Sequence, residues 1–188
     1  MTLHKSGEPI EYVVTYLEMS QPPGYPYPPM STGGPTSLLA ADEPPVWYFL
    51  NLYDAVGQDY EWTDQHEMAP EDIRRILHDP NVTLFTLMRT GWPAGFFVLD
   101  ARETGIVDIM YFGLVPEAMG QGLGRFLIET AIHTAWETPG TQKVTVNTNS
   151  LDHPRALPLY QRAGFVPVRR ESKARILTRD WVGHDQGS

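Results

Sequence analysis

A glycine-rich stretch, Val115 to Arg125, contains the residues whose types and spacing are best suited to chemistry. It holds Gly120, Gly122 and Gly124 and follows the apolar run 109–115. After it, apolar residues recur at spacings of three and four up to residue 135, which predicts a helix over 122–137. A helix start presents unpaired N–H groups and the positive end of the helix dipole. Glycines let a ligand approach the backbone, so the stretch predicts a site for an anion, above all a phosphate.

Two common phosphate-binding patterns do not fit this turn. A P-loop needs Gly-x-x-x-x-Gly-Lys-Ser/Thr, and the chain has no such string and no lysine in the turn. A dinucleotide fingerprint needs Gly-x-Gly-x-x-Gly after the first strand of a parallel unit. Counted from Gly120 or Gly122, the third glycine would fall on Arg125 or Leu127. The phosphate ligand is therefore neither a P-loop nucleotide nor a Rossmann dinucleotide.

A second stretch, Ala156 to Phe165, follows about 35 residues later. Together the two stretches resemble the GNAT family, the GCN5-related N-acetyltransferases, over residues 81–168. Gly122 and Gly124 match the small positions of the family's Arg/Gln-x-x-Gly-x-Gly/Ala turn, while Met119 replaces its Arg or Gln. The later motif is Asn-x-x-Ala-x-x-Leu-Tyr-x-x-x-Gly-Phe, and His153 replaces its asparagine. The residues that match this motif are Ala156, Leu159, Tyr160, Gly164 and Phe165.

This resemblance implies direct transfer of an acetyl group from acetyl-CoA to a primary amine. The pyrophosphate would lie on backbone N–H groups of the turn, with the Arg125 side chain either adding a contact or staying in solvent. The strand end at Leu114 and Val115 would pair with the pantetheine amides, and an N–H near Leu114 would polarise the thioester carbonyl. The expected cofactor-binding residues are Leu114, Val115, Gln121, Gly122, Leu123, Gly124, Arg125, His153 and Tyr160.

Three side chains are candidates for proton transfer. Tyr160 is the residue that the family uses to protonate the departing thiolate, and a phenol is a reasonable acid for this step. The alternative is that Tyr160 only packs in its helix. Asp108 is a base candidate if it faces the cleft, and otherwise a residue of the solvent face. His153 could be a base or cofactor contact, or only a cap or surface residue. The histidines show no metal-ligand spacing, so no metal is expected.

Composition and charge limit the class of protein, its partners and its location. The 188 residues are 41% hydrophobic and 20% charged, which predicts one globular domain, 1–188. A formal charge of −9 argues against a general nucleic-acid binder. The chain has no cysteine, which excludes thiol nucleophiles and disulfides. It shows no signal peptide or membrane-spanning stretch, so the default expectation is a cytoplasmic protein without membrane contact.

The expected order of elements is a strand over 10–19, helices over 46–57 and 70–77, and an antiparallel meander over 81–89, 94–101 and 106–115. The glycine turn and its helix follow, then a strand over 143–148, a helix over 154–163, a strand over 165–169 and a last strand near 175–177. This order predicts an α/β (mixed α+β) GNAT-like fold, with a central, mostly antiparallel sheet flanked by about four helices. Residues 20–45 hold 8 of the 17 prolines and predict an extended loop, and the tail 183–188 is expected to be disordered.

The acceptor side is expected among the helices before the meander and the proline-rich loop. Acidic residues crowd there and could attract a cationic amine, although such clusters are usually solvated faces. Aromatic residues of the same region could line an amine pocket or be buried against the sheet. Acetylation of a protein or peptide, and an acyl-CoA sensor without catalysis, stay open as alternatives. Homodimer formation through an exposed edge strand is also open. The aromatic residues are Tyr25, Tyr27, Trp47, Tyr48, Tyr53, Tyr60 and Trp62; the acidic ones are Asp54, Asp59, Glu61, Asp64, Glu67, Glu71 and Asp72.

Overall fold

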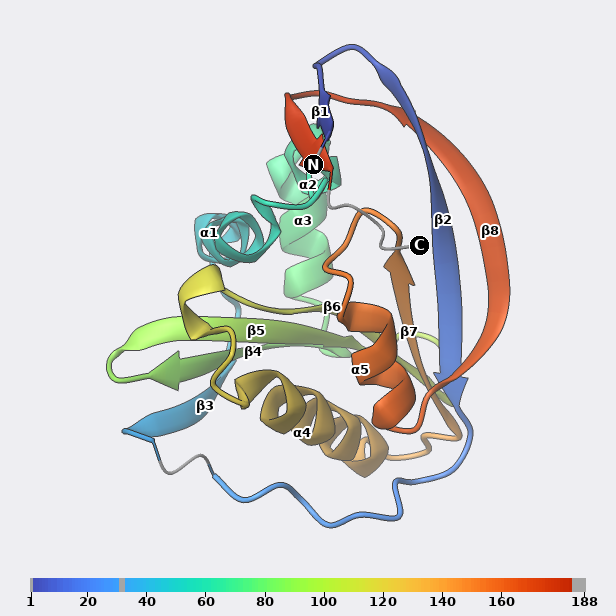
Figure 1. Cartoon of the computed structure of the whole chain (residues 1–188). Helices are drawn as coiled ribbons and strands as arrows, with labels where there is room; N and C mark the ends of the chain where they lie inside the picture. Colours follow the sequence, from blue (N-terminus) through green and yellow to red (C-terminus); the bar gives the residue numbers. More distant parts are fainter. Residues whose placement is uncertain (1, 31–32, 184–188) are drawn as a thin grey trace.

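A seven-stranded sheet organises the chain (Figure 1). The computed structural model describes residues 2–30 and 33–183. Only β6 and β7 run parallel, and every other neighbouring pair is antiparallel, which confirms the expected mixed fold. In spatial order the strands are β3 (Thr36–Ala41), β4 (Val82–Arg89), β5 (Trp92–Asp100), β6 (Ile106–Leu114), β7 (Lys143–Asn149), β2 (Pro9–Met19) and β8 (Val166–Ile176).

Helices cover both faces of this sheet. The Phe49 ring of α1 meets Phe96 on one face of β5, while α4 packs against β5, β6 and β7 from the other face. Their contact residues are almost fully buried and form one continuous core. No helix in the described ranges is long and apolar enough to cross a bilayer. The helices are α1 (Val46–Gly57), α2 (Asp64–Glu67), α3 (Pro70–Leu77), α4 (Leu123–Glu137) and α5 (Ala156–Arg162), with a 3-10 turn, η1, at Pro116–Ala118.

The sheet opens between its two parallel strands. β6 and β7 pair only from Ile106 opposite Lys143 to Ile109 opposite Val146. At this point β6 has a bulge: Val98 of β5 lies opposite Tyr111 and Leu99 opposite Ile109, which leaves Met110 as the extra residue. A bulge bends its strand and increases the local twist. β6 therefore leaves β7 after Ile109, and a gap forms beside the second half of β6.

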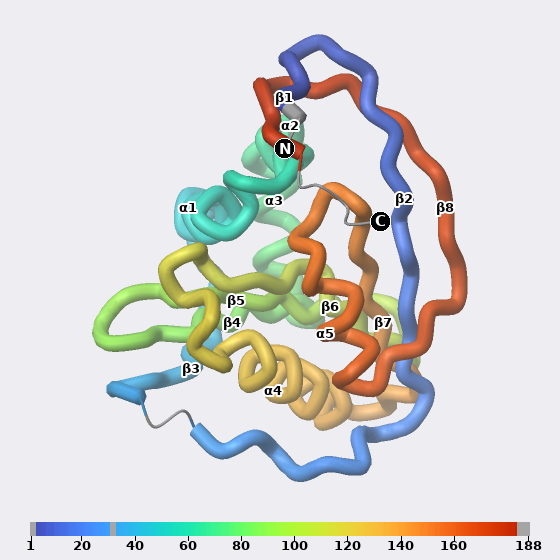
Figure 2. Tube along the Cα trace, in the orientation of Figure 1, coloured from blue at the N-terminus to red at the C-terminus, as the bar shows by residue number. Residues whose placement is uncertain are grey.

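The N-terminal strand completes the far side of the sheet. β2 lies between β7 and β8 and pairs with both in the antiparallel direction. Figure 2 shows β2 and β8 as two long, curved neighbours from opposite ends of the chain. The ends meet again where β1 (Thr2–His4) pairs with β9 (Trp181–Gly183). This half of the sheet therefore depends on contacts between residues more than 100 positions apart.

Several expectations about elements are corrected. The loop 20–45 contains β3, which is free of proline and pairs with β4. The two expected C-terminal strands form one strand, β8, because pairing with β2 continues from Pro9 to Glu18. The lead-in 1–9 includes β1. Gly183 ends β9, while the rest of the expected tail, 184–188, lies outside the described residues.

The proline-rich part of the loop runs along α4. The Tyr25 hydroxyl donates to the carbonyl of Ala163 at 2.9 Å, and the Tyr27 ring stacks on His133 with 4.4 Å between centroids. Tyr25 and Tyr27 thus hold the loop to the end of α5 and to α4.

Candidate active site

A cavity of about 410 Å³ occupies the gap between β6 and β7. It is lined by Tyr111, which faces the α1 side of the sheet, and by Phe112, which faces the α5 side. The cavity therefore reaches both faces through the gap. We call two parts of its lining the glycine wall and the aromatic wall. The glycine wall consists of Leu114, Met119, Gly120, Gly124 and Leu159, and the aromatic wall of Tyr53, Tyr60, Trp62 and Tyr111.

The glycine turn has the conformation that its sequence predicts. Gly120 and Gly122 have φ of 75° and 77°, a region that favours glycine. A Cβ on either residue would meet nothing within 4 Å, so the turn is open on that side. Gly122 is the N-cap of α4, and the first helical bond runs from the Phe126 N–H to its carbonyl at 3.5 Å. The N–H groups of residues 123–125 thus have no acceptor within the helix and can bind an anion.

The polar side chains of the turn are engaged with their own segment. Gln121 Nε2 donates to the carbonyl of Glu117 at 3.0 Å, which fixes the turn. Arg125 Nε donates to Glu129 Oε1 at 2.6 Å, and this bond raises the Arg125 pKa. The Arg125 side chain is 79% exposed and stands outside the cavity lining. The turn therefore offers an anion its backbone N–H groups rather than these side chains. Gln121, Gly122, Leu123, Arg125 and also Val115 do not line the cavity itself.

The end of β6 turns backbone groups into the gap. Leu114 lies opposite Gly95, and the next residue, Val115, donates its N–H to the carbonyl of Ala94 at 3.0 Å. Hydrogen-bonded positions alternate along an antiparallel pair. The N–H groups of Leu114 and Phe112 therefore point away from β5, toward the edge of β6 that is not paired with β7. An extended ligand can pair with this edge.

Tyr160 lies in α5 with its ring buried between two aromatic side chains. The ring centroids of Phe112 and Phe165 are 5.9 Å and 6.2 Å away. Gly164, at φ 105°, lets the chain turn so that the Phe165 N–H reaches the carbonyl of Tyr160 at 3.1 Å. Burial, and then the charge of Asp152, raises the Tyr160 pKa above its ordinary value. Tyr160 lines the cavity and stays protonated at neutral pH, as a proton donor must.

Asp108 is not brought to the cavity. It does not belong to the lining, and its Oδ1 accepts a hydrogen bond from Thr145 Oγ1 at 2.5 Å. Burial raises the Asp108 pKa, and the charges of Asp100 and Glu103 raise it further, against the effect of the Thr145 bond. The carboxylate is therefore enclosed between β6 and its neighbouring strands. The geometry gives no support to Asp108 as a direct base for a ligand in the cavity.

His153 has the capping role predicted for it, and it also lines the cavity. Its Nδ1 accepts a hydrogen bond from the Arg155 N–H at 3.0 Å, which satisfies a backbone donor where α5 begins. Its ring also lines the cavity and meets Tyr60 edge-on at 6.1 Å. Because Nδ1 is the acceptor, the neutral ring carries its proton on Nε2.

Sequence reasoning missed Asp152, which lies directly before His153. Its Oδ2 accepts hydrogen bonds from Thr148 Oγ1 and the Asn149 N–H, both at 2.8 Å. Its Oδ1 accepts one from Trp62 Nε1 at 3.0 Å. Asp152 and Trp62 both line the cavity, so this last bond joins its two sides. The only signal in the sequence was the position of an acid beside the late motif.

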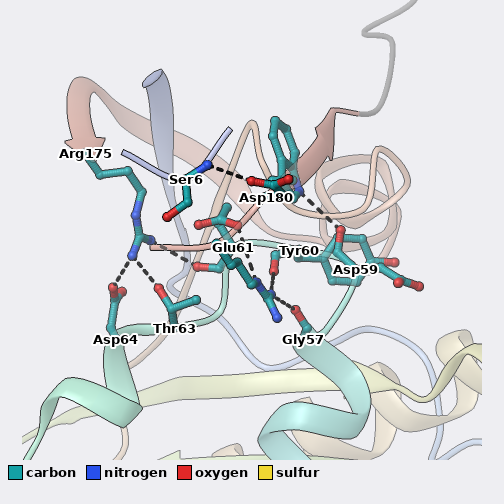
Figure 3. A network of polar contacts seen from close by, with 11 residues as sticks. Ser6, Gly57, Asp59, Tyr60, Glu61, Thr63, Asp64, Arg175 and Asp180 are labelled. Atoms are coloured by element: carbon teal, nitrogen blue, oxygen red, sulfur yellow. Dashed lines mark hydrogen bonds and ion pairs between the residues drawn. The ribbon is translucent and has the colours of Figure 1, made fainter. Parts of the chain in front are cut away.

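The aromatic wall is held by the C-terminal part of the chain (Figure 3). Arg175 of β8 donates to the carbonyl of Glu61 at 3.0 Å, to Thr63 Oγ1 at 2.6 Å and to Asp64 Oδ1 at 2.8 Å. Arg179 donates to the carbonyls of Gly57 and Tyr60. These bonds fix the connection between α1 and α2, a segment that belongs to no helix or strand. The position of the aromatic wall is therefore set by residues more than 100 positions away.

Comparisons with known proteins agree with this geometry. A mycothiol acetyltransferase of Jonesia denitrificans is 27% identical over 146 residues, which cover 73% of this chain and 46% of that protein. A GCN5-related N-acetyltransferase from Kribbella flavida has the same fold, with a TM-score of 0.59 and 18% identity over 86% of this chain and 56% of the other. A tandem GNAT protein from the clavulanic acid biosynthesis pathway, in a structure without AcCoA, has a TM-score of 0.60 and 17% identity, over 92% and 55% of the two chains.

The chain thus spans about half the length of each of these relatives. A family model described as the acetyltransferase (GNAT) family matches residues 49–165, more than half of the chain. This range contains the meander, the glycine turn and the late motif with Tyr160. The chain belongs to the acetyltransferase (GNAT) family.

Proposed function

We propose that this protein transfers an acetyl group from acetyl-CoA to a primary amine of a small molecule by direct attack. One observation carries the proposal. The N–H of Leu114 points into the gap beside β6, where the start of α4 and the Tyr160 side chain also meet the cavity. Groups suited to act as oxyanion donor, anion site and proton donor thus surround one space, and acyl transfer from a phosphorylated thioester needs these three.

The residues would hold acetyl-CoA with few charged side chains. Its pyrophosphate would lie on the N–H groups of residues 123–125, at the positive end of α4. Its pantetheine would pair with the free edge of β6 between Phe112 and Leu114, in the place of a β7 residue. This pairing directs the thioester toward the middle of the cavity. His153, at the start of α5, would contact the cofactor from the other side of the gap.

The amine nitrogen would attack the thioester carbonyl from the aromatic wall. The N–H of Leu114 would donate to the oxyanion that forms. When the tetrahedral intermediate collapses, the C–S bond breaks, and Tyr160 gives its proton to the sulfur of the departing CoA. The raised pKa keeps Tyr160 protonated until this step. The nitrogen loses its extra proton to water in the cavity, and water reprotonates Tyr160.

Two observations support a small acceptor. The cavity volume of about 410 Å³ is in the range of small-molecule sites. The network of Arg175 and Arg179 fixes the connection between α1 and α2 over the aromatic wall, where a peptide would need an open groove. Of the proline-rich loop, residues 20–30 and 33–45 are described, and none of these lines the cavity. The relative from Jonesia denitrificans is also named for a small molecule.

Release of free CoA thiol from acetyl-CoA tests this function with a panel of small primary amines and lysine peptides. We expect release that depends on a small amine and saturates with its concentration. Release with peptides but with no small amine would overturn the choice of acceptor. Saturable CoA binding without release on any amine, and with no effect of Tyr160→Phe on binding, would instead favour an acyl-CoA sensor.

A further inference from the structure

We propose that Asp152 binds the ammonium group of the acceptor, and that the acceptor is a cationic primary amine with an aromatic or similarly flat apolar body. This inference rests on the proposed function, because it assigns the acceptor side of the same cavity. The argument uses the hydrogen bonds of Asp152, the other charges in the cavity, and the rings beside it.

Asp152 has one acceptor position left. A carboxylate offers about four lone-pair positions, two on each oxygen. Oδ2 receives two hydrogen bonds, from Thr148 and Asn149. Oδ1 receives one, from Trp62, within the described part of the chain. The three donors fix the carboxylate in one orientation, and Asp152 lines the cavity, where a ligand can donate to Oδ1. An ammonium N–H is the donor that gains most from such a position.

The other carboxylates of the cavity already have cationic partners. Asp64 Oδ1 lies 2.8 Å from Arg175 Nη2, and Glu61 Oε1 lies 3.6 Å from Arg179 Nε. Among the described residues, no Lys, Arg or His nitrogen lies within 4.0 Å of Asp152. Its negative charge is therefore balanced by neutral donors alone. A bound cation would neutralise this charge.

Asp152 is also close to the reaction site. It lines the same cavity as Tyr160 and Tyr60. Burial, and then the charge of Asp152, raises the pKa of Tyr160; burial, then the charge of Asp59 and then that of Asp152, raises the pKa of Tyr60. An ammonium group on Oδ1 would thus stand near the proton donor of the transfer step. It must lose a proton before attack, so Asp152 first binds the cation, and solvent in the cavity then accepts the proton.

Trp62 connects this charge to an aromatic surface. Its ring lies 5.2 Å from Tyr53 and 5.9 Å from Tyr111, and a Cβ on Gly57 would come within 2.3 Å of the Trp62 Cβ. The indole is therefore held tightly, with its N–H on Asp152. Aromatic rings stack on flat apolar groups and attract cations at their faces. Trp62 thus acts as a positioning residue for Asp152 and as the surface for the body of the acceptor.

Two isosteric probes separate charge from shape. 2-Phenylethylamine is a cation at pH 7, whereas O-benzylhydroxylamine has the same number of heavy atoms and is uncharged. Calorimetric titration of the CoA-loaded protein gives their affinities without need of turnover. We expect the cation to bind about tenfold more tightly, the scale of one charge-assisted hydrogen bond. Equal affinities, or a preference for the uncharged probe, would overturn the inference even if acetyl transfer to another amine is observed.

Variants locate the charge. In Asp152→Asn the two probes should bind with about equal affinity, while CoA affinity stays the same. Asp64→Asn is the matched control in the same cavity, and it should keep the preference because Arg175 already neutralises Asp64. A preference that survives in Asp152→Asn, or disappears in Asp64→Asn alone, would overturn the assignment. If Asp152→Asn does not fold, Trp62→Phe removes one donor from Asp152 and should weaken binding of both probes while the cation remains preferred.

Discussion

The two walls of the cavity are built in different ways. The glycine wall and the turn beside it use backbone: two glycines at positive φ, Gly120 and Gly122, the start of α4 and the free edge of β6. The aromatic wall uses side chains, which are fixed by arginines from the end of the chain. A backbone site suits a ligand that stays the same while the sequence varies, because almost any sequence with the right turn provides it. A side-chain site can change its ligand by single substitutions. This difference fits a constant acetyl donor and a variable acceptor.

The largest effect is expected in the glycine turn beside the glycine wall. Gly122→Glu puts a negative side chain beside the anion site, and we expect CoA affinity to fall by at least about a hundredfold, since two charge-assisted hydrogen bonds contribute about 1.5–3 kcal/mol each. Gly140→Glu is the matched control, because Gly140 also has positive φ, at 83°, and open space around it. Titration with CoA and circular dichroism would measure both. Unchanged CoA affinity in Gly122→Glu would contradict the assignment of the turn.

The next effect separates catalysis from binding. Tyr160→Phe removes the proton donor but keeps the ring between Phe112 and Phe165. We expect the rate of thiol release to fall by about a hundredfold, at the lower end of general acid catalysis, with CoA affinity unchanged. Tyr48→Phe is a control away from the cavity, where the hydroxyl bonds to Thr86. Equal rates in Tyr160→Phe and the wild type would show that the tyrosine only packs.

A change in stability tests the contact between α1 and β6 next to the aromatic wall. A Cβ on Gly113 would lie 2.2 Å from Val56 Cγ1, so α1 can approach β6 only over a glycine. We expect Gly113→Ala to lower the free energy of unfolding by about 1–3 kcal/mol, as is typical of overpacking. Urea unfolding of a double-mutant cycle with Val56→Ala would measure the coupling. Additive effects of the two substitutions would mean that this contact is not what constrains position 113.

The smallest effect concerns Asp108. Its folded-state pKa is raised, so protonation favours the folded state. As pH rises from the unfolded-state pKa of about 3.9 through the higher folded-state pKa, this group lowers the stability of the wild type. Asp108→Asn should remove that loss. The free energy of unfolding of the variant, relative to that of the wild type, should therefore be higher at pH 7 than at pH 4. Acid and neutral urea unfolding would measure this. A large loss of thiol release in the same variant would restore Asp108 as a catalytic base.

Much of the glycine wall was predictable because it is local. The strand, turn and helix between residues 106 and 137 follow from apolar spacing and glycines within one short segment, and the structure has them within one residue of the expected bounds. Tyr160 was found through its motif and does line the cavity. Asp108 does not line the cavity, and its carboxylate accepts a hydrogen bond from Thr145 of β7, the strand that separates from β6 beyond the bulge at Met110. Neither the bulge nor its partner strand has a local signal.

The sequence by itself determined most of the elements, the glycine turn and the family resemblance, since each depends on residues close together in the chain. Only the tertiary structure decided where the N-terminal strand inserts, how far β6 and β7 separate, and which acids face the cavity. Asp152 and Trp62 are 90 residues apart, yet one hydrogen bond joins them across the cavity. Such a pair depends on the packing of the whole sheet, because strand order and register place it, and no spacing in the chain encodes it.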